Sequence, residues 1–150
     1  MHKSSIMIPP IWLLLAIFVQ FVLHFSCPIL DCPSDNSKYG GILIVATGII
    51  LIVWAIKSFI QAGTPIRPFQ KVISLVSSGP YRFTRNPMYL GFLIILFGIA
   101  AGMGSLAPFI VLPIFFVFVQ RHFVFREEAL MQEQFGTSYA DYCSRVKRWI

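Results

Sequence analysis

Hydrophobic residues in this chain form long unbroken stretches instead of alternating with polar ones. Residues 8–25 and 39–60 make two such stretches, and residues 88–119 make a third that carries no charge over 32 positions. A helix needs ~20 apolar residues to cross a bilayer. The first two stretches have about that length, whereas one helix of 32 residues would extend about 48 Å and overshoot a ~30 Å hydrocarbon core.

The third stretch contains a turn signal. The segment AAGMGS, residues 100–105, places two glycines and a serine near its middle, which favours a tight helical hairpin. The pattern therefore predicts an all-α integral membrane protein whose last two transmembrane helices form that hairpin. The four transmembrane helices are expected at about residues 8–25, 39–60, 87–102 and 105–125, and a cytoplasmic helical tail at residues 126–150.

The first stretch has an alternative interpretation as a signal peptide. It lacks a small-residue cleavage site, and Pro28 and Asp31 follow it. These features favour a transmembrane helix that is retained in the mature protein.

The composition and the charge support a membrane protein. Charged residues make up only 12% of the chain, against about 25% in soluble domains. The net charge is +6, but the charges flank the apolar stretches and form no basic stripe, which argues against nucleic-acid binding. With four transmembrane helices, every Lys and Arg except Lys38 falls on one side of the membrane. Because positive residues collect on the cytoplasmic side, we predict a multi-pass protein with both its N- and C-termini in the cytoplasm.

The cysteines leave one pairing open. Cys27 and Cys32 fall in the non-cytoplasmic loop, where an oxidising compartment would permit a disulfide, and two unpaired cysteines are the alternative. Cys143 is expected to be cytoplasmic and reduced. No Cys and His residues have the spacing of a zinc site, and no P-loop or dinucleotide-binding glycine pattern is present, so we expect no metal.

The tail has the pattern of soluble protein. Gly136 is expected to end its first helix. A second short helix then presents one face that carries Tyr139, Tyr142 and Val146. Arg148 and Trp149, close to the end, are expected to anchor the tail at the membrane interface.

The segment SSGPYRFTRNPMYLG, residues 77–91, places polar and rigid residues directly before the third transmembrane helix. Asn is a strong N-cap and Pro suits a first turn, so Asn86 and Pro87 are expected to begin that helix. A purely structural role, with Arg82 and Arg85 at the lipid headgroups, explains this segment as well as a binding role does.

An acidic pair, Glu127 and Glu128, lies where the fourth helix leaves the membrane. The pair is either a solvated face with Arg121 or Arg126 as partners, or a site for a cationic ligand group such as an ammonium or a sulfonium. If the last two transmembrane helices form a hairpin, this pair lies beside the segment that precedes the third helix. The residues that could then face one pocket are Asn86, Tyr89, Arg121, His122, Glu127 and Glu128.

These two motifs together resemble a known family. GPYRFTRNPMYLG, followed by REEALMQEQFGTSYADYCSRVKRWI, is similar to the isoprenylcysteine carboxyl methyltransferase and phospholipid methyltransferase superfamily over residues 77–150. The resemblance implies an integral membrane methyltransferase that uses S-adenosylmethionine, releases S-adenosylhomocysteine and holds the cofactor in a cytoplasmic pocket. The cofactor-binding positions that it implies are Tyr81, Arg85, Asn86, Pro87, Tyr89, Gly91, Glu127 and Glu128. The prenylcysteine enzymes have His at the position of Asn86 and usually more transmembrane helices, so the substrate does not carry over.

The methyl acceptor is expected to be a lipophilic small molecule or a lipid that enters from the bilayer. A carboxylate acceptor needs a cationic clamp, for which the candidates are Arg121, Arg126 and Arg145. An amine acceptor needs a base, for which Glu127 and His122 are candidates, although His122 is also typical of a plain interfacial residue. We predict Arg121, Arg126 and Glu127 as catalytic residues, and the C-terminal motifs favour carboxyl O-methylation over amine N-methylation.

Two other classes of protein stay open. One is a non-catalytic membrane scaffold or lipid-binding protein, and the other is a related membrane reductase that uses NADPH. The reductase would need a larger basic cofactor site than this sequence offers. The segment GGILIVATG in the second helix has small residues spaced for close helix packing, which leaves a homodimer open.

Overall fold

The computed structural model describes residues 9–27, 29, 34–63 and 74–150, and within them the chain is helical without any β-strand. The α-helices are α1 (Pro9–Ser26), α2 (Asp35–Gln61), α3 (Pro87–Met103), α4 (Val111–Val119), α5 (Phe125–Phe135) and α6 (Thr137–Arg145). Short 3₁₀ turns lie at η1 (Gly79–Arg82) and η2 (Ala107–Ile110), and a π-helical turn, η3 (Gln120–Val124), joins α4 to α5.

Three helical segments in the described part of the chain are long and apolar enough to cross a membrane, namely α1, α2 and the continuous segment Ala107–Phe135. α3 is also apolar but shorter, with 17 residues. The predicted all-helical membrane protein is therefore confirmed, while α3 as a fourth transmembrane helix stays a prediction. The last segment passes residue 125, where we predicted the span to end, without a break in the helix.

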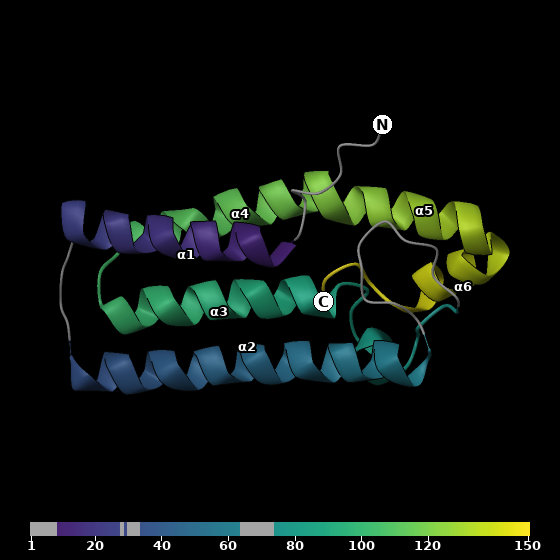
Figure 1. The fold of residues 1–150 in the computed structure, drawn as a ribbon, viewed down its shortest axis with the longest axis horizontal. Coiled ribbons are helices and arrows are strands. Elements are labelled where there is room, and N and C mark those ends of the chain that lie inside the picture. The colour runs from purple at the N-terminus through teal and green to yellow at the C-terminus, as the bar shows by residue number, and fades with distance from the viewer. Residues whose placement is uncertain (1–8, 28, 30–33, 64–73) are drawn as a thin grey trace.

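α3 is the central helix of the bundle (Figure 1). It packs against α2 on one side and against α1 and α4 on the other. The turn between α3 and η2 begins at Gly104, whose φ of 69° is left-handed and favours glycine. The hairpin predicted from AAGMGS is therefore present. The core of the bundle is apolar, and Leu96 of α3 and Phe123 of η3 are fully buried within it.

Glycines on both helices allow α2 and α3 to pack closely. A Cβ atom added to Gly41 of α2 would lie 2.6 Å from the Gly98 carbonyl oxygen of α3, and one added to Gly48 would lie 2.8 Å from the Gly91 carbonyl oxygen. Small residues of this kind let two helix backbones approach each other in a membrane. The segment GGILIVATG is therefore accounted for by packing within one chain, and a homodimer stays a prediction.

Polar side chains tie the bundle together away from the predicted site. Gln20 of α1 is fully buried, and its Nε2 donates to the carbonyl oxygens of Leu96, at 3.0 Å, and Pro108, at 3.3 Å. Closer to the C-terminal end of α1, His24 Nδ1 and Ser105 Oγ lie 2.7 Å apart. These bonds pair Gln20 Nε2 and His24 Nδ1, which would be costly to leave unpaired in an apolar surrounding, while the buried Oε1 of Gln20 has no partner within the described residues.

The tail folds as its sequence pattern predicts. Gly136, with a φ of 50°, ends α5, and α6 follows. The predicted face of Tyr139, Tyr142 and Val146 is buried as one cluster. Other predictions fall outside the described residues: these concern Pro28, Asp31, the pairing of Cys32 with Cys27, and the charges of Lys3, Arg67 and Lys71.

Candidate active site

The predicted site begins at the N-terminal end of α3, where Asn86 occupies the N-cap position and Pro87 follows in the first turn. The prediction that Asn86 and Pro87 begin the third helix is therefore confirmed, although the Asn86 side chain makes no capping hydrogen bond. Its Nδ2 instead donates to the carbonyl oxygen of Arg148, at 3.0 Å, because the chain's last residues pass close to this buried amide. The Asn86 backbone N–H donates to Thr84 Oγ1, at 3.2 Å.

In the first turn of α3, Tyr89 connects this end of the bundle to α5. The Tyr89 hydroxyl donates to Glu127 Oε1 over 2.7 Å. The ring of Tyr89 packs against Phe92 and Phe123, so the hydroxyl is held by a buried aromatic group. The structure therefore brings the start of α3 and the acidic pair together, as the hairpin predicts.

The second glutamate has different partners. Arg148 forms a bidentate pair with Glu128, with Nε to Oε1 at 2.9 Å and Nη2 to Oε2 at 2.8 Å. Arg85 Nη1 lies 3.4 Å from Glu128 Oε1. The hydrogen bonds to Glu128 raise the pKa of Arg148, so its guanidinium stays charged. The structural partners of Glu128 are thus Arg85 and Arg148, whereas the alternative of a solvated face named Arg121 or Arg126 as partners.

Arg85 also reaches α6. Its Nη1 donates to Cys143 Sγ at 2.7 Å, and its backbone N–H donates to the Lys147 carbonyl oxygen at 3.0 Å. The Arg85 side chain is 15% exposed and makes its contacts within the protein, whereas the purely structural alternative placed it at the lipid headgroups. Its buried Nε has no partner within the described residues.

Tyr81 is fixed by the tail. The Tyr142 hydroxyl of α6 donates to the Tyr81 carbonyl oxygen over 2.7 Å. Burial raises the pKa of Tyr142 to about 12, so this hydroxyl stays protonated and remains a donor. The Tyr81 ring packs edge-on against Phe59 of α2. Tyr81 thus lies buried in a contact between η1, α2 and α6.

Other predicted residues have different surroundings. A Cβ on Gly91 would lie 3.0 Å from the Gly48 carbonyl oxygen, which places Gly91 in the contact with α2. The proposed clamps, Arg121, Arg126 and Arg145, are all exposed. His122 is exposed too, stacks on the Phe118 ring and lies with Nδ1 3.0 Å from the Phe118 carbonyl oxygen, as an interfacial histidine would.

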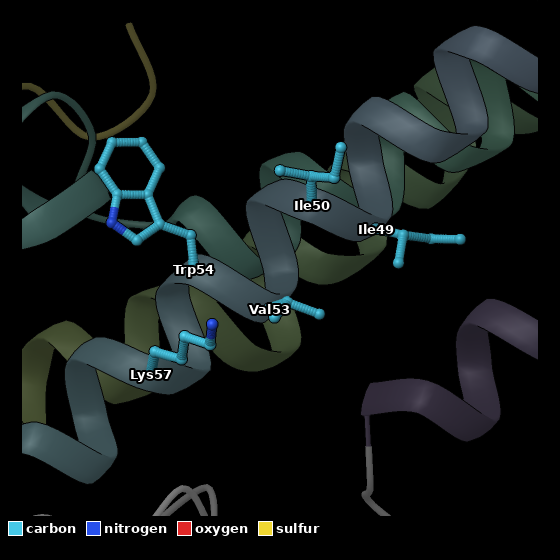
Figure 2. A pocket seen from close by; sticks show the side chains of 5 residues that line it. All are labelled: Ile49, Ile50, Val53, Trp54 and Lys57. Atoms are coloured by element: carbon cyan, nitrogen blue, oxygen red, sulfur yellow. The ribbon is translucent and has the colours of Figure 1, made fainter.

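Two cavities lie elsewhere on the bundle. One, of about 320 Å³, is lined by Ile49, Ile50, Val53, Trp54 and Lys57 on the face of α2 that points away from α3 (Figure 2). The other, of about 410 Å³, is lined by Leu23, Cys27, Ile29, Leu106, Ala107 and Ile110, between the C-terminal end of α1 and η2. Both have mostly apolar walls, which suit lipid contact better than a polar cofactor.

Sequence reasoning missed the role of the chain's last residues. Arg148 and Trp149 were expected to be interfacial anchors, but Arg148 pairs with Glu128, and Trp149 Nε1 donates to Gln120 Oε1 at 3.0 Å. The available signal was a basic C-terminal end, which the charge pattern predicts on the same side of the membrane as the adjacent glutamates Glu127 and Glu128.

The fold and this cluster together define a helical membrane protein with a polar site at one end of an apolar bundle. The chain belongs to the phospholipid methyltransferase family, whose match spans residues 36–138. This confirms the resemblance over residues 77–138 and extends it into α2, while residues 139–150 lie outside the match. An uncharacterized protein of Haemophilus influenzae is 30% identical over 63 residues, which cover 42% of this chain and all of that protein. No solved structure matches the chain.

Proposed function

We propose that this protein is an S-adenosylmethionine-dependent methyltransferase that acts on a lipophilic acceptor at the cytoplasmic membrane face. One arrangement carries the proposal: Glu127, held by the Tyr89 hydroxyl, lies where α3 meets α5 within the residues matched by the family. Bound here, S-adenosylmethionine would supply a methyl group activated on a sulfonium sulfur. The protein's task is then to bind and orient the reacting groups.

The side chains at this site fit a cationic ligand. Tyr89 donates to Oε1 of Glu127, and no ion pair in the described part of the chain engages this carboxylate. A partly buried carboxylate attracts a cation more strongly than it does in water. Ammonium and sulfonium groups are cations of this kind. Glu127 and Tyr89 are therefore the residues that would hold the cofactor, and Tyr81, Asn86 and Pro87 at the same end stay candidates.

The first test is ligand binding to the detergent-solubilised protein. Calorimetry should detect S-adenosylhomocysteine binding to the wild type, and Glu127→Gln should weaken it about 10- to 100-fold, the range expected for losing a hydrogen-bonded charge. Glu133→Gln, an exposed change on the same helix, is the matched control and should bind like the wild type. If millimolar S-adenosylhomocysteine gives no heat of binding, a non-catalytic scaffold is favoured. If NADPH binds instead, a reductase is favoured.

The acceptor has two candidates, each with its own support. The C-terminal motifs favour a carboxylate, which is already a nucleophile and releases no proton. The family is named for phospholipids, which favours an amine headgroup, whose proton could pass to the Glu127 carboxylate. The exposed positions of Arg121, Arg126 and Arg145 do not add to the carboxylate case.

Product chemistry distinguishes these acceptors. The protein is incubated with methyl-labelled S-adenosylmethionine and a membrane extract. Label released as methanol by mild alkali would identify a carboxyl ester, and alkali-stable label in lipid would identify N-methylation. The C-terminal motifs favour an O-methyltransferase, so we expect mild alkali to release the label as methanol.

A further inference from the structure

The last residues of the chain, 146–150, form a segment that we name the C-terminal strap. After α6 the strap returns to the start of α3, where Figure 1 shows the C-terminus. Its carbonyl groups receive three hydrogen bonds from residues 84–86. The donors are the Arg85 backbone N–H to Lys147, at 3.0 Å, and Asn86 Nδ2 and Thr84 Oγ1 to Arg148, at 3.0 and 3.1 Å.

Side chains of the strap contact the continuous helical segment Ala107–Phe135, which contains α4, η3 and α5. The Arg148 guanidinium donates hydrogen bonds to both carboxylate oxygens of Glu128, and its central carbon lies 5.0 Å from the centre of the Phe125 ring. Trp149 donates to Gln120, and its ring lies 5.0 Å from that of Phe116. The strap thus fastens residues 84–86 to α4 and α5. These contacts come from residues beyond the family match, which ends at residue 138.

The strap makes the two glutamates unequal. Both oxygens of Glu128 accept hydrogen bonds from Arg148, and the Glu128 side chain is only 16% exposed. Because its oxygens are already hydrogen-bonded, the Glu128 carboxylate has little capacity to bind a cationic ligand. Removal of Arg148 would leave the Glu128 carboxylate as a poorly solvated charge. Glu127, by contrast, accepts one hydrogen bond from a neutral hydroxyl.

We propose that Arg148 is a positioning residue: it fastens the strap over residues 84–86 and withdraws Glu128 from ligand binding, which leaves Glu127 as the carboxylate for the cationic ligand. The part that concerns the ligand rests on the proposed function. Glu128 then acts only through Arg148, so the effects of changing either residue must be coupled.

A double-mutant cycle tests this coupling. S-Adenosylhomocysteine affinity is measured by calorimetry for Glu128→Gln, Arg148→Gln and the double variant. We expect each single change to weaken binding about tenfold and the double change to weaken it no further, because contacting partners are not additive. Arg148→Lys, which keeps the charge but not the bidentate geometry, should bind between Arg148→Gln and the wild type. Additive effects, or unchanged affinity in Arg148→Gln, would overturn the proposal.

A second measurement needs no ligand. Arg85 joins Glu128 to the Cys143 thiol, so a loosened strap should expose that thiol. In a Cys27→Ser, Cys32→Ser background, Arg148→Gln and Glu128→Gln should increase the rate of Cys143 alkylation severalfold. The matched controls, Arg82→Gln and Glu133→Gln, change exposed residues and should leave it unchanged.

The two readouts separate the strap from the proposed function. If the wild type does not bind S-adenosylhomocysteine, the proposed function and the ligand part of this inference both fail. The alkylation rate still decides whether Arg148 fastens the strap, and a rate that does not change in Arg148→Gln would overturn that part. Circular dichroism selects the variants that keep their helices, and Arg148→Lys provides the mildest change if Arg148→Gln does not fold.

Discussion

Glu127 and Glu128 are neighbours in the sequence, and the structure gives them different surroundings. Successive residues of an α-helix point about 100° apart. Glu127 therefore meets Tyr89 of α3, while Glu128 meets Arg148, which lies 20 residues further along the chain. The sequence shows that an acidic pair is present, but the difference between its members arises from the return of the chain's last residues.

Replacing Tyr89 with Phe tests the hydroxyl that holds Glu127. The ring contacts with Phe92 and Phe123 remain, so any fall in the thermal unfolding midpoint should come only from the lost hydrogen bond to Glu127. S-Adenosylhomocysteine affinity, measured by calorimetry, should fall about three- to tenfold, because one hydrogen bond of ~1 kcal/mol is lost. Tyr39→Phe, an exposed change on α2, is the control. Wild-type affinity in Tyr89→Phe would exclude a role for this hydroxyl.

The sequence predicts which segments meet at the site, but it does not predict which side chains bond to each other there. The meeting of the acidic pair with the start of α3 follows from the hairpin connection, which the glycines at the turn indicate. The direction of the Asn86 side chain does not follow from local sequence, because the same amide can cap a helix or bind a distant carbonyl group. Tertiary packing of the strap decides in favour of Arg148.

At the scale of elements, apolar length predicted the helices because the bilayer fixes how long they must be. The π-helical turn η3 was not predicted. Such a turn shifts the backbone hydrogen bonds by one residue, a change that no hydrophobic period records. Because η3 immediately precedes α5, it also sets the direction in which Glu127 and Glu128 point.

The contact between α2 and α3 gives a prediction for stability. A Cβ on Gly98 would lie 2.8 Å from the Val45 backbone nitrogen and 2.9 Å from the Gly41 carbonyl oxygen, and neither helix backbone can move away cheaply. We expect Gly98→Ala to lower the free energy of unfolding by about 1–3 kcal/mol. Thermal unfolding in detergent measures the effect.

Gly40 provides the matched control for this change. It lies on α2 next to Gly41, and an added Cβ would have no neighbour within 4 Å. Gly40→Ala should therefore leave stability unchanged or raise it slightly, since alanine favours a helix. Equal losses in the two variants would show that close packing of α2 against α3 is not the cause.

At the scale of the whole molecule, the two ends of the bundle differ. The end that carries the site holds Arg85, Glu127, Glu128 and Arg148, while the C-terminal end of α1 carries the His24–Ser105 contact. The positive-inside rule predicts that the site end faces the cytoplasm. This orientation would give a water-soluble cofactor and a membrane-borne acceptor access to the same place.

Labelling of single cysteines tests this orientation. In sealed right-side-out vesicles, a membrane-impermeant maleimide should label Cys27, which is exposed at the end of α1, in a variant without the other cysteines. A single cysteine placed by Ser138→Cys, exposed on α6, should be labelled only after permeabilisation. The reverse pattern would place the site on the outer face.

The most direct test of the account is methyl transfer itself, measured with labelled S-adenosylmethionine and a membrane extract. We expect the wild type and Glu133→Gln to transfer label to extracted lipophilic material at similar rates. Glu127→Gln, with its helices intact, should transfer label at least about tenfold more slowly, as expected for losing a hydrogen-bonded charge. Transfer by Glu127→Gln at the wild-type rate, or no transfer by a wild type that is folded, would contradict the central claim.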